Sequence, residues 1–363
     1  MAYLYGRNWT RDEIRSRLGH VEQLCGIERV VLDDGPARGV RAAILRTGTG
    51  LEIEVLLDRA MDLGRASFNG QALAYRAPGG DSHPAFYDAA GLNWLRTFGV
   101  GLLCTCGMQN VGSPSEDEGR AHGLHGGLSA TPAHDIGVES GWEGSEFRFR
   151  LSGRVREVTP LGLFGPNLCL TRTLSGVLGG NTIEISDTVE NEGFTPSPLM
   201  LLYHFNLGFP LLDRGGRLTT ASARVTPRDA TAAAGLKDWS QVDAPRPGYA
   251  EQVFFHDMKP DAQGWAKAML VAPSRPSGGP LALCLEYDAR ALPRFIQWKQ
   301  LGSGVYVMGL EPANCLVLGR AAERQAGTLQ MLAPGEKRVF SLRLSVFDNA
   351  EDIARTEGEL SSR

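Results

Sequence analysis

Residues 146–151 read Glu-Phe-Arg-Phe-Arg-Leu, and this stretch carries the clearest signal for the fold. Its three apolar side chains fall on every second residue, with charged residues between them. Because successive side chains of a β-strand point to opposite faces, this alternation predicts a strand with one buried and one solvent-facing side. Leu51–Leu57 and Phe340–Val346 repeat the pattern towards the two ends of the chain. The sequence therefore predicts an all-β protein built from antiparallel sheets.

Further short runs of the same character are separated by turn-forming residues. The chain has 45 glycines and 20 prolines, above the average proportion, which suits many short strands joined by tight turns. Residues 221–248 are rich in Ala, Pro and Asp without alternation, and we interpret them as a long surface excursion or lid. The other runs that we expect to form strands are Thr182–Val189, Leu281–Tyr287, Phe295–Lys299 and Val305–Leu310.

One helix is predicted, near the beginning of the chain. Thr10 can cap the N-terminus of Arg11–Leu18, acidic residues lie in the first turn, where they are favourable, and Gly19 follows the last turn. No repeat or linker divides the chain. We therefore expect one β domain over residues 1–363, with residues 1–25 as an N-terminal helical extension.

The charge and hydrophobicity of the chain exclude several classes of protein. With 37 basic and 41 acidic side chains the net charge is −4, which does not suit binding to nucleic-acid phosphates. No apolar run reaches the roughly 18 residues of a membrane helix, and the polar N-terminus lacks the apolar segment of a signal peptide. The six cysteines are scattered like buried thiols of a reducing compartment, and Cys104 with Cys106 is a weak metal motif on its own. We therefore expect a soluble, cytoplasmic protein without a nucleic-acid or membrane partner.

Chemistry is expected at polar residues in apolar or glycine-rich surroundings, since the common nucleotide, zinc-protease and hydrolase motifs are absent. His122 and His125 lie in a glycine-rich loop, which either lets a ligand approach closely or is a solvated turn. His204 shares one face of an apolar strand with Asn206, so it either belongs to a polar pocket or is a satisfied core histidine.

Glu311 follows the apolar run that begins at Val305. A carboxylate there is costly to bury unless it is paired, for which Arg320 is a candidate. Alternatively, partial burial raises its pKa into the range that suits proton transfer.

Two further groups could bind the hydroxyls of a polyol. Arg59 and Asp62 follow the predicted strand at 51–57, and they could equally pair with each other. Gln297 and Lys299 share one face of their strand, opposite Trp298. That arrangement suits sugar hydroxyls, and it suits a wet sheet surface equally well.

Three of these segments, in this order, resemble motifs of the aldose 1-epimerase (galactose mutarotase) superfamily. They are HGLHGG at 122–127, LLYHFNLGF at 201–209 and GLEPANC at 309–315. Mutarotases show a similar LHGG segment, a strand histidine followed by FNL, and a Gly-x-x-Leu-Glu strand. The similarity spans about Arg59 to Val346 and is best to an uncharacterised, aldose-1-epimerase-related branch. It implies an antiparallel β-supersandwich, here with a short N-terminal helix, in agreement with the alternation.

The resemblance also implies roles for individual residues. His204 matches the general acid on the ring oxygen, Glu311 matches the base on the anomeric hydroxyl, and His125 matches a substrate-contacting histidine. Mutarotases usually have an Asn-Arg pair shortly before LHGG, where this chain has Gln109 and Asn110 and no arginine. The residues expected to bind substrate are His125, Arg59, Asp62, Asn110, Gln297 and Lys299.

The first functional hypothesis is therefore a mutarotase, an isomerase that interconverts sugar anomers by acid–base catalysis without a metal or organic cofactor. Its partner would be a small sugar, and we expect a monomer or homodimer. The second is another sugar epimerase or isomerase in the same pocket, which a divalent metal on His122, His125, His204 and Glu311 would favour. The third is a sugar-binding protein without catalysis.

Overall fold

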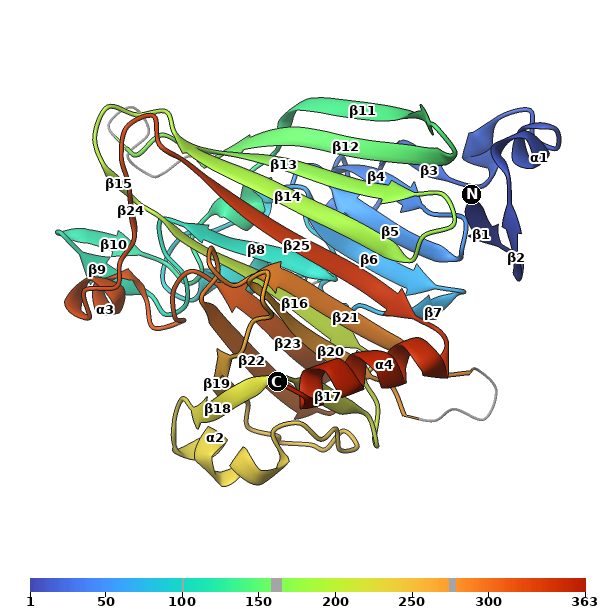
Figure 1. Ribbon diagram of the computed structural model, residues 1–363. Helices are drawn as coiled ribbons and strands as arrows, with labels where there is room; N and C mark the ends of the chain where they lie inside the picture. The colour runs from blue at the N-terminus through green and yellow to red at the C-terminus, as the bar shows by residue number, and fades with distance from the viewer. Residues whose placement is uncertain (100, 158–164, 274–278) are drawn as a thin grey trace.

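The computed structural model describes residues 1–99, 101–157, 165–273 and 279–363 (Figure 1). Three large sheets of eight, six and five strands dominate it, and their neighbouring strands are antiparallel. The predicted all-β architecture is therefore confirmed. Among the described residues, no helix combines the length and apolar character needed to span a membrane.

The eight-stranded sheet contains the stretch that decided the fold prediction. Residues 146–151 lie in β12, where Phe147, Phe149 and Leu151 are buried and the residues between them are exposed. A slip of one residue would exchange the two faces, so the alternation fixes the register. In spatial order the strands are β11 (His134–Glu143), β12 (Glu146–Arg156), β13 (Leu168–Val177), β14 (Thr182–Asn191), β25 (Lys337–Phe347), β21 (Ala282–Asp288), β20 (Trp265–Val271) and β17 (Arg217–Thr220).

The strand order of the six-stranded sheet is β18 (Ser222–Pro227), β19 (Gln252–Met258), β22 (Arg294–Gly302), β23 (Val305–Ala313), β16 (Met200–Gly208) and β8 (Leu103–Met108). The six-stranded sheet is buried on both faces at its strands β8, β16 and β23, whereas its edge strand β18 is largely exposed. Every residue of β16 is buried, as the nearly continuous apolar sequence of this strand requires.

The chain that leaves the five-stranded sheet after its last strand is hydrogen-bonded to the backbone of β16 in the six-stranded sheet. Tyr75 N donates to Asn206 O at 3.1 Å, and Gly208 N donates to Leu73 O at 3.0 Å. The five strands are β3 (Gly26–Val31), β4 (Arg41–Arg46), β5 (Leu51–Leu56), β6 (Asp62–Phe68) and β7 (Gln71–Ala72). Three pairs of short strands complete the strand set of the described residues: β1 (Ala2–Leu4) with β2 (Arg7–Trp9), β9 (Ser115–Asp117) with β10 (Arg120–His122), and β15 (Ser197–Pro198) with β24 (Met331–Leu332).

The main apolar core takes side chains from all three large sheets. A second apolar cluster, which includes Trp94, Cys104, Leu202, Ile296 and Cys315, involves β8, β16, β22 and β23 of the six-stranded sheet. The candidate site lies on this second side. That all these parts form one domain stays a prediction.

The helices differ in part from the sequence-based expectation. Thr10 caps α1 (Arg11–Arg15), as predicted, and forms a capping box with Glu13, but the helix ends at Arg15, earlier than Leu18. The expectation of a long excursion at 221–248 is only partly right, because it contains β18, which pairs with β19, as well as α2 (Ala230–Ala234).

Two further helices, α3 (Arg320–Gln325) and α4 (Ala350–Ser361), were not predicted. Ile353 and Leu360 of α4 pack into an apolar cluster with Met269 and Cys284, and the helix lies beside the lower edge of the eight-stranded sheet in Figure 1.

Candidate active site

The candidate site is a cavity of about 280 Å³ on the side of the six-stranded sheet that faces the second apolar cluster. Strands β16, β22 and β23 supply its floor, and the segment around η4 (Asn93–Thr97) and the loop at 112–125 supply walls. His125, His204 and Glu311, the three residues matched to the family motifs, all line this cavity.

His204 and Glu311 meet because β16 and β23 are neighbours in register, with Phe205 opposite Leu310. Nε2 of His204 lies 3.3 Å from Oε1 of Glu311, and the two residues are only 5% and 2% exposed. The contact does not have the geometry of a hydrogen bond, so Oε1 of Glu311 is buried without a hydrogen-bond partner. Nδ1, the other nitrogen of the His204 ring, is also buried without one. Because buried polar atoms are nearly always satisfied, the pair is arranged to receive another polar group.

Burial shifts the two groups in opposite directions. It raises the pKa of the Glu311 carboxyl well above its usual value, with a further contribution from the negative charge of Glu251. Burial, and then the neighbouring His125, lower the pKa of His204 to about 3. Burial therefore favours the neutral form of both groups, with the proton on the carboxyl group of Glu311 and not on the imidazole of His204.

Gly309 makes the close approach of these side chains possible. A Cβ atom at this position would lie 2.7 Å from Oε1 of Glu311, 3.0 Å from Cβ of Trp298 and 3.1 Å from Cε1 of His204. Any larger residue would therefore push apart the groups that form the floor of the cavity.

His125 is held in a defined orientation by Gly112. Its backbone N donates to Gly112 O at 3.0 Å, and Gly112 N donates back to Nδ1 of the ring at 3.3 Å. Burial lowers the pKa of His125 to about 4, so the ring is neutral at pH 7. Since Nδ1 accepts, the proton is on Nε2, and the ring offers a donor to a ligand. The φ angle of 57° at His125 is in the left-handed region, so the loop holds this residue in an unfavourable backbone conformation.

Aromatic rings surround the pair. Trp94 stacks on Phe98 with ring centroids 4.4 Å apart, and Phe98 and Trp298 each lie 5.5 Å from the ring of His204. Trp94 and Phe98 could not be recognised from the sequence, because neither belongs to a motif and both come from a segment without periodicity. Trp298 was noticed only as the neighbour of two polar residues.

Gln297 and Lys299, predicted to bind substrate, lie on the opposite face of β22 from the cavity. Oε1 of Gln297 lies 3.2 Å from His256 Nε2 and its Nε2 donates to Trp239 O at 2.8 Å, while Nζ of Lys299 donates to Asp238 O at 2.6 Å. The alternation correctly put these two residues on one face, but Trp298 is the residue that faces the cavity. The structure therefore does not bring Gln297 and Lys299 to this cavity.

Arg59 and Asp62 also lie outside the cavity. Arg59 donates to Ser82 O at 3.1 Å, and Asp62 accepts from Thr105 N and from Nη1 of Arg172 at 3.0 and 3.2 Å. Both line a separate, water-sized cavity of about 10 Å³. Phe98 lines the small cavity as well as the large one.

Asn110 supports the site from behind instead of lining the cavity. Its Nδ2 donates to Ser113 O at 3.1 Å and Gly123 O at 2.8 Å, and its Oδ1 accepts from Arg320 N at 2.8 Å. It thereby ties together the two ends of the loop that carries His125.

The sequence also allowed an ion pair between Glu311 and Arg320 and a metal site that includes His122, and the structure shows neither among the described residues. Arg320 forms its ion pair with Asp117 at 2.6 Å, so it is not the partner of Glu311. His122 does not line the cavity. In the described ranges no group of three or more His, Cys, Asp or Glu residues is placed to hold a metal ion.

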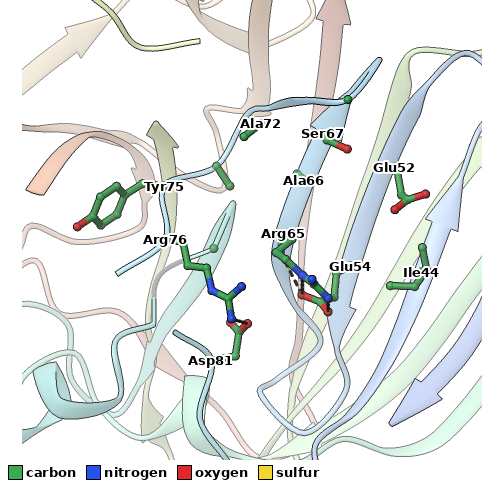
Figure 2. A pocket seen from close by; sticks show the side chains of 13 residues that line it. Ile44, Glu52, Glu54, Arg65, Ala66, Ser67, Ala72, Tyr75, Arg76 and Asp81 are labelled. Carbon is green, nitrogen blue, oxygen red and sulfur yellow. Dashed lines mark hydrogen bonds and ion pairs between the residues drawn. The ribbon is translucent and has the colours of Figure 1, made fainter. Parts of the chain in front are cut away.

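A larger hollow of about 400 Å³ lies beside β5, β6 and β7, away from His204 and Glu311 (Figure 2). Figure 2 shows two ion pairs among its charged side chains: Arg65 pairs with Glu54 at 2.7 Å, and Arg76 pairs with Asp81 at 3.3 Å. Because these charges are already paired, we place the chemistry in the smaller cavity, where buried atoms lack partners.

The arrangement of sheets defines the chain as a galactose mutarotase-like protein. It belongs to the family described as Domain of unknown function (DUF4432), which it matches over residues 37–346. No curated protein sequence matches it significantly.

Several solved structures share the fold. A putative aldose 1-epimerase from Klebsiella pneumoniae is 26% identical, with a TM-score of 0.85 over 93% of this chain and 87% of that one. A galactose mutarotase-like protein from Clostridium acetobutylicum is 11% identical, with a TM-score of 0.63 over 90% of this chain and 99% of that one. A galactose 1-epimerase from Lactobacillus acidophilus is 14% identical, with a TM-score of 0.54 over 90% and 99%.

Proposed function

We propose that the protein is an aldose 1-epimerase-like isomerase that interconverts the anomers of a small sugar through His204 and Glu311. The observation that carries this proposal is the buried pair, 3.3 Å apart, whose unpartnered atoms lie in an aromatic-lined cavity. The 26% identity to a putative aldose 1-epimerase over most of both chains supports the same reaction class.

The reaction needs one proton acceptor and one proton donor near the anomeric carbon. The anomeric hydroxyl gives its proton to one member of the pair, the bond between C1 and the ring oxygen breaks, and the ring oxygen receives a proton from the other member. Rotation about C1–C2 of the open aldehyde and reversal of the two transfers produce the other anomer. No proton is gained or lost overall, so the pair must carry a single exchangeable proton at the start and at the end.

The distribution of that proton between the two residues can differ from the family assignment. The resemblance assigns His204 as acid and Glu311 as base, whereas burial favours a neutral His204 and a protonated Glu311. Either distribution supports ring opening, because each residue acts as donor in one direction and as acceptor in the other. His125 can donate from Nε2 to a sugar oxygen, and Trp298 offers a flat apolar surface to a face of the ring.

Anomer-exchange NMR of free sugars, measured with and without the protein, tests the proposal. We expect accelerated exchange between the α and β signals with wild type and its loss in His204→Asn. His134→Asn, at an exposed histidine in β11, is the matched control and should exchange at the wild-type rate. A protein that binds sugars but never accelerates exchange would instead be a binding module.

A further inference from the structure

The walls of the candidate cavity are largely apolar. Leu124, Val253, Ile296 and Val317 line it together with the aromatic rings, and Leu92 and Leu95 stand at its rim with 60% and 54% of their surface exposed. A fully hydroxylated sugar would have to place several hydroxyl groups against such walls.

The polar groups that are free to bind a ligand are concentrated at the floor. At the floor they are Nε2 of His125, Nε2 of His204 and Oε1 of Glu311, and the wall adds only the exposed hydroxyl of Ser113 among the described side chains. Towards the rim, the indole N–H of Trp298 is already donated to Oε2 of Glu251 at 2.8 Å. The cavity can therefore satisfy hydroxyls near the reacting carbon better than hydroxyls elsewhere on the sugar.

The charge of the lining also restricts the ligand. Of the described lining residues, Arg228 is the only arginine or lysine. Its Nη2 donates to Oε1 of Glu251 at 3.1 Å and its Nε donates to Asp229 at 3.0 Å, so two carboxylates offset its charge. With Glu311 on the floor, the described lining offers no uncompensated positive charge to a phosphate or carboxylate, and burying such an anion without a partner is costly.

We propose that the site selects a neutral 6-deoxyhexose, whose C5 substituent is a methyl group, over sugars that carry a hydroxyl, phosphate or carboxylate at that position. This rests on the proposed function, since it assumes that the reacting end of a sugar meets His204 and Glu311. The methyl group then lies against the apolar walls without loss, whereas a hydroxyl would give up water there and gain no partner. Apolar pockets discriminate against an added hydroxyl by roughly 10- to 100-fold.

Matched pairs of sugars that differ by one oxygen test the proposal: 6-deoxy-D-glucose with D-glucose, L-rhamnose with L-mannose, and L-fucose with L-galactose. D-glucose 6-phosphate and D-glucuronate supply the anionic substituents. Dissociation constants from tryptophan fluorescence, for which Trp94 and Trp298 in the lining are suited, are measured beside anomer-exchange rates by NMR. In at least one pair we expect the 6-deoxy sugar to bind and exchange roughly 10-fold better or more, and the anionic sugars to be the poorest ligands.

The two measurements separate the two proposals. Preferred binding of a 6-deoxy sugar without accelerated exchange would uphold the selectivity and overturn the isomerase. Accelerated exchange with equal or better use of the hydroxylated, phosphorylated or acidic sugars would uphold the isomerase and overturn the selectivity. Absence of binding by every sugar tested would overturn both.

Discussion

Two adjacent residues of β16 enter opposite sides of the six-stranded sheet, and their surroundings differ sharply. Tyr203 points to the main core, where its hydroxyl donates to Oδ2 of Asp187 at 2.8 Å. His204 points into the cavity, where its Nδ1 has no hydrogen-bond partner. Both side chains are buried, so burial alone does not distinguish them.

On the Tyr203 side the buried charges are saturated. Arg172, with no exposed surface, donates to Asp187 at 2.7 and 3.0 Å, to Asp62 at 3.2 Å and to Thr105 Oγ1 at 3.0 Å. Since these residues come from all three large sheets, the network holds the sheets together. On the His204 side, Glu311 has no arginine partner, and its Oε1 lies near His204 without a hydrogen bond. The comparison indicates that the satisfied charges around Arg172 serve the fold, whereas the Glu311 oxygen that lacks a hydrogen bond is the one that the proposed function uses.

The largest expected effect concerns Glu311. Glu311→Gln keeps the shape of the side chain but cannot exchange a proton, so we expect kcat for anomer exchange to fall about 10²–10⁴-fold while sugar binding changes little. Glu357→Gln, in α4 and paired with Arg217, is the control and should retain full activity. Retained turnover in Glu311→Gln would remove Glu311 from the mechanism.

For Arg172 we expect a substitution to lower the stability of the fold. Arg172→Met leaves Asp62 and Asp187 buried without their cation, and breaking a buried pair in this way costs about 3–5 kcal/mol of unfolding free energy. Urea denaturation followed by circular dichroism measures the loss. A variant as stable as wild type would show that the network does not hold the sheets together.

The stability of wild type and of Glu311→Gln should also depend differently on pH, because only the wild type has the titrating carboxyl group of Glu311. The pKa of this group is raised in the folded protein. The contribution of Glu311 to the free energy of unfolding is therefore fully present below about pH 4.5, and it is lost as the pH rises through the raised pKa. A glutamine side chain does not titrate, so Glu311→Gln should become more stable than wild type at alkaline pH, by about 1.4 kcal/mol for each unit of the pKa shift.

The same titration should appear in the activity of wild type. Exchange should decline as pH rises above the Glu311 pKa, because the pair then loses its single proton. It should persist in acid until about pH 3, where His204 gains a second proton. Melting curves and NMR exchange rates across the pH range measure the two effects, and a wild type that is most active and most stable at alkaline pH would contradict both.

The smallest effect is expected on the far face of β22. Lys299→Met and Gln297→Ala should leave the KM for sugar within about twofold of wild type, because neither side chain reaches the cavity. Trp298→Ala, on the near face, should weaken binding in the same titration. A large rise in KM for Lys299→Met would restore the original sequence-based assignment.

The sequence predicted correctly those features that depend on a single strand. Alternation located β12 and the central strands, and a histidine or glutamate inside an apolar run marked His204 and Glu311. Alternation also showed that Gln297 and Lys299 share a face, but not which face, since that depends on what covers each side of the sheet.

Features that depend on pairing between distant strands could not be predicted. Arg172 reads as an ordinary polar residue of β13, and only the meeting of three sheets shows that it is fully buried. In the same way Asp62 looked like a sugar ligand because its true partners, Thr105 and Arg172, are remote in the chain. Trp94 and Phe98 lie in a segment whose place over the site is set by tertiary packing alone.

The cavity is lined by residues from strands and by residues from connecting segments, and these two parts can change independently. His204, Glu311 and Gly309 belong to nine-residue strands in the middle of a hydrogen-bonded sheet, whereas Leu92, Leu95 and Leu124 come from connecting segments. Mutations that remodel the connecting segments can therefore alter which molecules the cavity accepts while His204 and Glu311 keep their geometry. A combinatorial library confined to residues 92–95 and 124 would explore new specificities on a fixed chemical centre.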